Sequence, residues 1–428
     1  MRKFMQTRLQ RCAAAALLSA NLGVSAQGLD FNGALRAALE RAPALQARSA
    51  SVQGAAALQT SAAELPDPKL SVGIDSLPIN GPDRGSLTRD NFTQRQLGWT
   101  QDVPNRAKRA ARADAALART EREQALLQME RLAVRREAGL AWLARYFADR
   151  RLLLFDELIA QQRRLQETAP AQLAAGKINP VDVSMIKLET LALADRRDEL
   201  QRESHHAHAL LRRWIGDADA DGKNPNASNR EGSLAGGLPV FKVDRPYLQT
   251  NLERTPEIAA LIPSRAMADA EVREAEAAQS GDWSWSIRYG KRGPAYSDFV
   301  SAQLSFDLPM STAKRQQPQI YAKQKEVERI TAERDDMLRR QTQELESQLS
   351  ELSELDSKLV RLTGQTLPLA AERSALALVA YQSGRDKLAA VLDARKQQTE
   401  LGLRALELQA KQRAVQWRLN SILPEPVP

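Results

Sequence analysis

Short stretches in which apolar and polar residues alternate interrupt a chain whose other apolar residues recur every three or four positions. The clearest alternation covers 300–307, where every second residue from Val300 is apolar and the residues between are polar. Similar alternation covers 70–75, 96–101 and 283–288. A period of two residues is typical of a β-strand with one apolar and one polar face. The sequence therefore predicts four amphipathic strands, in two pairs.

The remaining periodic segments predict helices, because they are rich in Ala, Arg, Glu, Gln and Leu and spaced for a helical face. Pro66-Asp67-Pro68 and Ser280-Gly281-Asp282 are expected to end the helices that precede the strands. Ala169-Pro170 with Gly176-Lys177-Ile178-Asn179-Pro180, and later Ser383-Gly384-Arg385, are expected to form the tips of helical hairpins. The expected helices cover 31–64, 105–167, 181–215, 247–279, 318–362 and 386–422.

The chain also repeats itself, which indicates a tandem duplication of one large unit. Leu39-Glu40-Arg41-Ala42-Pro43 recurs as Leu252-Glu253-Arg254-Thr255-Pro256, and Asp102-Val103-Pro104 recurs as Asp307-Leu308-Pro309. Further landmarks keep the same order, with Trp214 echoed by Trp417. The expected division is a signal peptide at 1–26, a first repeat at 27–215, an inter-repeat segment at 216–246, a second repeat at 247–423 and a tail at 424–428.

The amino-terminal residues predict export. Four basic residues precede an apolar run at 13–18, and small residues follow up to an expected cleavage site after Ala26. The single cysteine, Cys12, lies in this segment, so the expected mature chain forms no disulfide or thiolate metal site. Removing four of the 61 basic residues leaves 57 against 53 acidic ones, or +4 instead of +8. This modest, dispersed charge does not indicate a nucleic-acid partner.

Aromatic residues decide how the strands are interpreted, since a half-buried hairpin of a soluble protein would show the same alternation. They gather in and beside these strands, as expected where a transmembrane β-barrel meets the membrane interfaces. Four strands cannot close such a barrel, which needs about eight, whereas three chains supply twelve strands and twelve helical runs. The expected aromatic girdle consists of Trp99, Trp283, Trp285, Tyr289, Phe299 and Phe306.

Several ordered motifs resemble those of the TolC family of outer-membrane efflux factors. The resemblance covers the expected mature chain and rests on Leu65-Pro66-Asp67-Pro68, Gln101-Asp102-Val103-Pro104, the spacing of Gly176 to Asp182, and Tyr381-Gln382-Ser383-Gly384 before Asp393. The stretch from Leu65 to Asp83 is most similar to the CzcC-like branch, which serves heavy-metal efflux.

Membership of this family implies a mainly α-helical fold with a small β part. A homotrimer would place a 12-stranded β-barrel in the lipid of the outer membrane and extend an α-helical barrel of long hairpins into the periplasm. The resemblance also implies that the tips dock on a periplasmic adaptor, itself coupled to an inner-membrane pump. The implied docking residues are Gly176, Lys177, Ile178, Gly384 and Arg385.

Asp182 and Asp393 match acidic positions that the family carries near these tips, and three copies would form carboxylate rings that favour cations. They are the candidate periplasmic gate. Where the family often has a second acid one turn before Asp393, this chain has Ala390, which weakens the expected ring.

No common catalytic signature occurs, so we expect a passive duct without a cofactor rather than an enzyme. The three histidines, His205, His206 and His208, are clustered, which could suggest a metal site. No further metal ligand is evident nearby in the sequence, so a solvated or packed helix face explains them better. The expected cargo is heavy-metal cations. Drug efflux, type I secretion and a periplasmic coiled-coil adaptor are the alternatives.

Overall fold

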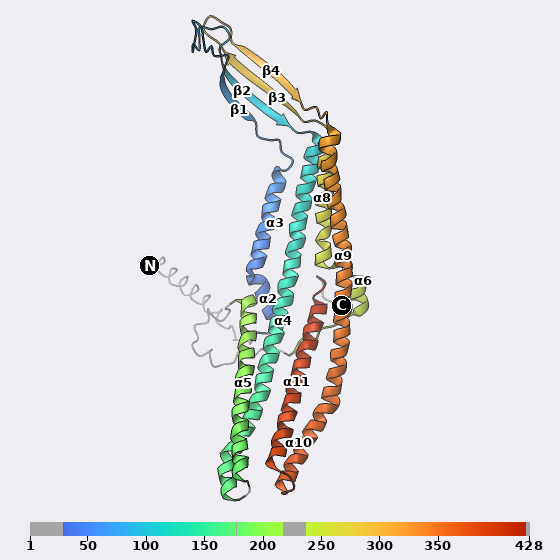
Figure 1. The fold of residues 1–428 in the computed structure, drawn as a ribbon. Coiled ribbons are helices and arrows are strands. Elements are labelled where there is room, and N and C mark those ends of the chain that lie inside the picture. Colours follow the sequence, from blue (N-terminus) through green and yellow to red (C-terminus); the bar gives the residue numbers. More distant parts are fainter. Residues whose placement is uncertain (1–28, 177, 217–236, 425–428) are drawn as a thin grey trace, which may run out of the picture.

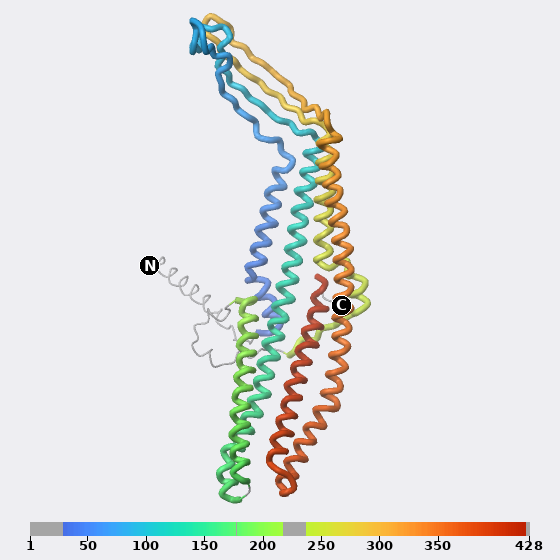
Figure 2. Tube along the Cα trace, viewed as in Figure 1, coloured from blue at the N-terminus to red at the C-terminus, as the bar shows by residue number. Residues whose placement is uncertain are grey.

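The protein is an elongated helical structure with a small sheet at one end, as seen in a computed structural model that describes residues 29–176, 178–216 and 237–424 (Figure 1). The expected signal peptide, Cys12, Lys177 and most of the inter-repeat segment lie outside the described residues. The sheet projects beyond the helices, and the turns of two helical hairpins form the opposite end (Figure 2). Among the described residues, no helix is long and apolar enough to cross a membrane.

Both halves of the chain run through the same order of elements, namely helices, two strands, a long helix and a returning helix. The first half contains α2 (Phe31–Arg41), α3 (Pro43–Ser61), β1 (Lys69–Asp75), β2 (Gln94–Val103), α4 (Arg106–Ala174) and α5 (Pro180–Ile215). The second half contains α6 (Arg245–Thr250), the 3₁₀ turn η1 (Leu252–Arg254), α7 (Pro256–Ala259), α8 (Leu261–Ala277), β3 (Trp283–Lys291), β4 (Phe299–Phe306), α9 (Thr312–Arg361), the π-helical turn η2 (Leu362–Thr366), α10 (Leu367–Gln382) and α11 (Leu388–Asn420).

The two helices expected at 31–64 and 247–279 are each interrupted at a proline. Pro43 begins α3 after a break at Ala42, and Pro256 begins α7 after the extended residue Thr255. Proline disfavours the helical conformation in the residue before it and lacks an N–H, so each forces a new helix to start. Both prolines belong to the repeated Leu-Glu-Arg-X-Pro motif, and the prediction of continuous helices was wrong at the same point in each half.

Proline has the opposite outcome in the hairpins. The break expected at Ala169-Pro170 is absent, because α4 continues through Pro170 and ends one turn later. The helix expected to end at Leu362 also continues, through η2 and α10. There the N–H of Leu367 donates to the carbonyl of Leu362, five residues back, just before Pro368. A π turn shifts the hydrogen-bond pattern where Pro368 could not donate, so the helix passes the proline without ending.

The four strands form one antiparallel sheet in the order β1-β2-β3-β4. The central pairing of β2 with β3 joins the two halves of the chain, with Trp99 opposite Ile287. Because β2 leads into α4 and β3 follows α8, this pairing also sets those two helices side by side (Figure 1). An ion pair between side chains reinforces this junction, since Lys108 Nζ lies 2.9 Å from the Asp282 carboxylate.

An aromatic core lies in the middle of the molecule and again joins the halves. The ring of Phe31 meets Trp142 and Trp417 edge to face, at centroid distances of 5.3 and 4.9 Å. Both indoles are buried and donate to backbone carbonyls, Trp142 to Leu29 at 3.1 Å and Trp417 to Arg136 at 2.9 Å. Edge-to-face packing with satisfied indole N–H groups is a favourable arrangement for buried aromatic rings.

Gly139 of α4 makes this packing possible, which leads to a stability prediction. A Cβ at Gly139 would lie 2.3 Å from Nε1 of Trp417. Replacing Gly139 by Ala is therefore expected to destabilise the protein by about 1–3 kcal/mol through overpacking. The measurement is urea unfolding followed by circular dichroism.

The matched control for this change is Gly54→Ala in α3, where an added Cβ meets nothing within 4 Å. That variant is expected to be more stable than wild type by about 0.5–1 kcal/mol, because alanine favours a helix interior over glycine. If both variants moved the unfolding midpoint in the same direction, the contact between Gly139 and Trp417 would not be the cause.

Candidate functional site

The sheet has one apolar and one polar face, and both are open to solvent. The strand register places the apolar residues of all four strands on a single face, where the exceptions are Arg95, Gln101 and Lys291. Val72 is 78% exposed and Leu304 is 63% exposed. The apolar residues on this face are Leu70, Val72, Ile74, Leu97, Trp99, Val103, Trp283, Trp285, Ile287, Tyr289, Val300, Ala302, Leu304 and Phe306.

Five of the six expected girdle residues lie on this apolar face, but Phe299 does not. Phe299 pairs with Gly290, and this register directs its side chain to the polar face. A Cβ at Gly290 would lie 2.3 Å from the Phe299 ring, so the ring covers the bare glycine. The Arg292 guanidinium sits 5.5 Å from the ring centroid. The prediction grouped Phe299 with the others by its position near a strand end, whereas a shift of one residue reverses the face.

The polar face satisfies its own hydrogen-bonding groups across the strands. Lys69 Nζ lies 2.7 Å from the Asp102 carboxylate, and Arg288 donates to Gln303 at 2.6 Å. The Gln96 amide donates to Asp75 at 3.1 Å. These groups are polar and accessible, so this face suits contact with water, in contrast to the apolar face behind it.

The sheet is also incomplete at its sides. Within the described residues, β1 pairs only with β2 and β4 pairs only with β3, so both outer edges lack a neighbouring strand. Unpaired edges of a sheet template the addition of further strands. The sheet therefore offers an apolar face and two free edges for assembly.

The turn between α4 and α5 forms one of the two tips. Gly176 has a φ of +68°, which favours glycine. The Asn179 side chain accepts from the Asp182 N–H at 2.8 Å, and the Asp182 carboxylate accepts from the Asn179 N–H at 3.0 Å, which forms a capping box. Ile178 is buried in a cluster with Leu388 of α11. Its side chain therefore faces the second hairpin of the same chain.

The turn between α10 and α11 forms the second tip. Gly384 has a φ of +72°, and the Arg385 N–H donates to the Ala380 carbonyl at 2.9 Å, which closes the end of α10. The Arg385 side chain is exposed. Of the expected docking residues, Gly176, Gly384 and Arg385 are thus exposed at the tips, and Lys177 lies outside the described residues.

The two candidate gate residues differ in their surroundings. Asp182 is half-buried and held in the capping box of α5. Asp393 is exposed on α11 and has no hydrogen-bond or ion-pair partner among the described residues. They lie on separate hairpins, so a single chain does not bring them together as a ring.

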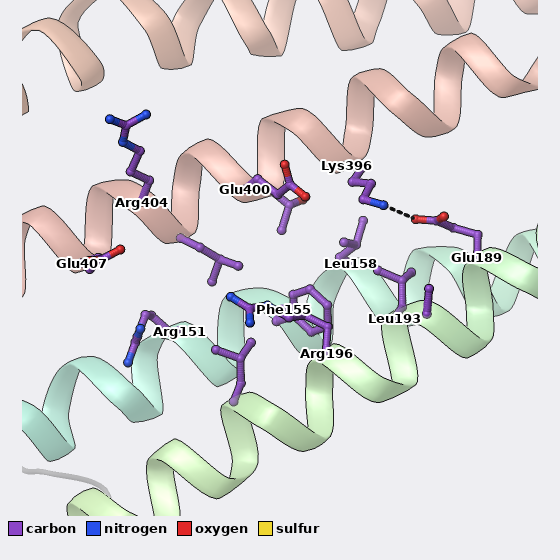
Figure 3. A pocket seen from close by; sticks show the side chains of 14 residues that line it. Arg151, Phe155, Leu158, Glu189, Leu193, Arg196, Lys396, Glu400, Arg404 and Glu407 are labelled. Carbon is purple, nitrogen blue, oxygen red and sulfur yellow. Dashed lines mark ion pairs between the residues drawn. The ribbon is translucent and has the colours of Figure 1, made fainter.

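A groove between the hairpins, with a volume of about 510 Å³, was not anticipated from the sequence (Figure 3). Phe155, Leu158 and Leu193 line its apolar part. Lys396 of α11 reaches Glu189 of α5 across it, at 3.5 Å. Charged residues line the groove from α11 with helical spacing, a pattern that could have indicated it: Lys396, Glu400, Arg404 and Glu407.

Of the three clustered histidines, only His208 contacts the neighbouring helix. His208 Nε2 lies 3.2 Å from the Asp149 carboxylate of α4, and Ser204 donates to the same carboxylate at 2.7 Å. Burial alone would raise the pKa of Asp149, but the hydrogen bonds from His208 and Ser204 outweigh it and lower that pKa. His205 and His206 are exposed. Among the described residues, no group of three or more His, Cys, Asp or Glu is placed to hold a metal ion.

The geometry described above, with a small sheet on long helical hairpins, is shared with several solved membrane proteins, among them outer-membrane channels. A membrane protein from Pseudomonas aeruginosa superposes with a TM-score of 0.77 at 16% identity, over 93% of this chain and 91% of that one. CusC, whose structures were studied for transmembrane channel formation, superposes with a TM-score of 0.74 at 16% identity, over 92% of this chain and 93% of that one. The open state of the MtrE outer-membrane channel of Neisseria gonorrhoeae superposes with a TM-score of 0.74 at 16% identity, over 93% of this chain and 89% of that one.

The likeness lies in the fold and not in the sequence. No protein-family model and no curated protein sequence matches the chain. At these identities the comparisons establish the architecture that was expected, a mostly helical chain with a small antiparallel sheet. The CzcC-like branch, the trimer and the cargo stay predictions.

Proposed function

We propose that three copies of this chain form a passive duct through the bacterial outer membrane, which extends into the periplasm as part of a tripartite efflux system. The observation that carries this proposal is the sheet, whose apolar face is uncovered and whose two edges are unpaired. In water such a face would be costly to expose, and in lipid the unpaired backbone groups would be costly as well. Closing three sheets into a 12-stranded barrel removes both costs.

The helices support assembly with further copies. Val181, Leu188 and Leu191 of α5 are 66%, 68% and 65% exposed, and Leu369 and Leu376 of α10 are 63% and 61% exposed. Within each helix these exposed residues recur at helical spacing. Apolar stripes of this kind bury themselves against other helices. A homotrimer with an α-helical barrel would cover them.

The tips then face the periplasm, because the sheet at the opposite end occupies the membrane. We propose that a periplasmic adaptor docks on the exposed tip residues Gly176, Gly384 and Arg385, together with Lys177, and connects the duct to an inner-membrane pump. The alternative in which the chain is itself an adaptor predicts compact β-domains beside a hairpin. The described sheet is instead one uncovered layer, which favours the duct.

Charge on the apolar face provides a test of membrane insertion. Leu304→Lys in β4 places an ammonium on the apolar face, at a cost of up to about 2–4 kcal/mol in a membrane. Its matched control, Ser305→Lys, adds the same charge one residue further along on the polar face. We expect Leu304→Lys to reduce the heat-modifiable trimer recovered from outer-membrane fractions, and Ser305→Lys to leave it near wild type. Equal recovery of the two variants would contradict the proposal.

The periplasmic gate provides a second test. Three copies of Asp393 near the axis would attract cations, so Asp393→Ala is expected to raise conductance and to weaken block by divalent cations in planar-bilayer recordings. Glu400→Ala on the same helix serves as the control, since Glu400 lines the groove between the hairpins. A current–voltage curve of Asp393→Ala identical to that of wild type would remove this residue from the gate.

For the cargo we propose heavy-metal cations, on the resemblance of 65–83 to the CzcC-like branch. A strain that lacks the protein is expected to become sensitive to metal salts, and to regain resistance when the gene is restored. The measurement is growth across a series of metal salts and antibiotics. Sensitivity to antibiotics alone would assign the duct to drug efflux instead.

A further inference from the structure

Two basic residues lie directly opposite each other on the apolar face of the sheet. The register pairs Arg95 of β2 with Lys291 of β3, and both side chains are exposed. They are the only charged positions on this face within the described strands. Like charges at directly opposed positions destabilise a sheet unless something neutralises them.

Neither residue of this pair forms an ion pair within the described part of the chain. Neighbouring carboxylates have other partners: Asp298 accepts from the Tyr289 hydroxyl at 2.5 Å, Asp75 accepts from Gln96 on the opposite face, and Asp90 accepts from the Thr93 N–H at 2.9 Å. The position is therefore open to an anion from outside the chain.

The pair also lies at the end of the sheet that is remote from the helices. The helices join the sheet at Val103 and Trp283, and Arg95 and Lys291 lie at the other end of the same two strands (Figure 1). At the helical end of the apolar face, Trp283 pairs with Phe306 and no basic residue occurs. If the helices extend into the periplasm, the basic pair lies at the level of the outer leaflet.

We propose that Arg95 and Lys291 bind a phosphate group of lipid A in the outer leaflet of the outer membrane. This inference rests on the proposed function. Guanidinium and ammonium groups both donate to phosphate oxygens, with arginine able to do so through two N–H groups. On the same face, one step nearer the helices, apolar surface is available to the acyl chains of the same molecule. It is provided by Leu97, Tyr289 and Val300, which are 49%, 42% and 68% exposed. Free phosphate would gain nothing from that surface.

The test is the binding of lipid A to the purified full-length trimer, measured by native mass spectrometry against phosphatidylethanolamine as competitor. Each basic residue near an anionic lipid strengthens the binding constant by about a factor of five. The double variant Arg95→Gln, Lys291→Gln is therefore expected to weaken lipid A binding about 30-fold. Arg95→Lys should retain most of it. The control is Arg288→Gln, which removes a positive charge from the polar face of β3 and should leave binding unchanged.

Three outcomes would overturn the inference. They are lipid A binding by the double variant equal to wild type, an equal loss in Arg288→Gln, and competition by inorganic phosphate as effective as that by lipid A. Flotation with phosphatidylethanolamine vesicles separates this inference from the proposed function. A wild-type protein that does not float with vesicles contradicts the duct, whereas a protein that floats but ignores lipid A contradicts only the phosphate site.

Discussion

The pairing of β2 with β3 is the interaction on which the rest of the structure depends. These strands come from different halves of the chain, and their register places Trp99 opposite Ile287 and aligns the apolar residues of all four strands on one face. The same pairing brings α4 beside α8, where Lys108 and Asp282 meet. It also leaves β1 and β4 on the outside. The sheet that forms thus has two outer edges without a partner strand among the described residues, and such edges can template the addition of further strands.

A second join, in the middle of the molecule, makes the two hairpins one body. Trp417 of α11 packs against Gly139 of α4, and Phe31 fills the space between Trp417 and Trp142. The two joins are far apart along the helices, and each involves residues from both halves (Figure 2). Since long helices are stabilised by packing along their length, these two contacts stabilise the helical part between the sheet and the aromatic core. The hairpins continue beyond the aromatic core to the tips.

The sequence predicted the strands well because a period of two residues is a local signal. The alternation expected at 96–101 lies within β2 (Gln94–Val103). Phe299 lies on the polar face, apart from the other five expected girdle residues, because the register decides which face a side chain takes. Prolines were harder to interpret. Pro43 is the first residue of α3, whereas Pro170 and Pro318 lie inside α4 and α9, so proline alone does not tell where a helix ends. The tip residue Ile178 was predicted to face an adaptor, but it is buried against the second hairpin, a contact that no local pattern reveals. The proposed gate would need symmetry-related copies of Asp393, and a single chain does not show these.

The contacts near the tips indicate how such a duct would open. Within each hairpin, apolar contacts such as Phe155 with Leu193 hold the helices together. Between the hairpins, the ion pair of Lys396 with the half-buried Glu189 is open to solvent on the lysine side, and ion pairs open to solvent are worth about 0–1 kcal/mol. Ile178 has to leave its cluster if the hairpins separate, a cost of about 1.5–3 kcal/mol. Leu403 of α11 also packs against the Phe155 cluster, so separating the hairpins has to break apolar contacts between them as well. The Asp182 carboxylate is held in the capping box of α5, whereas Asp393 has no such partner among the described residues, so the proposed gate rests more on Asp393.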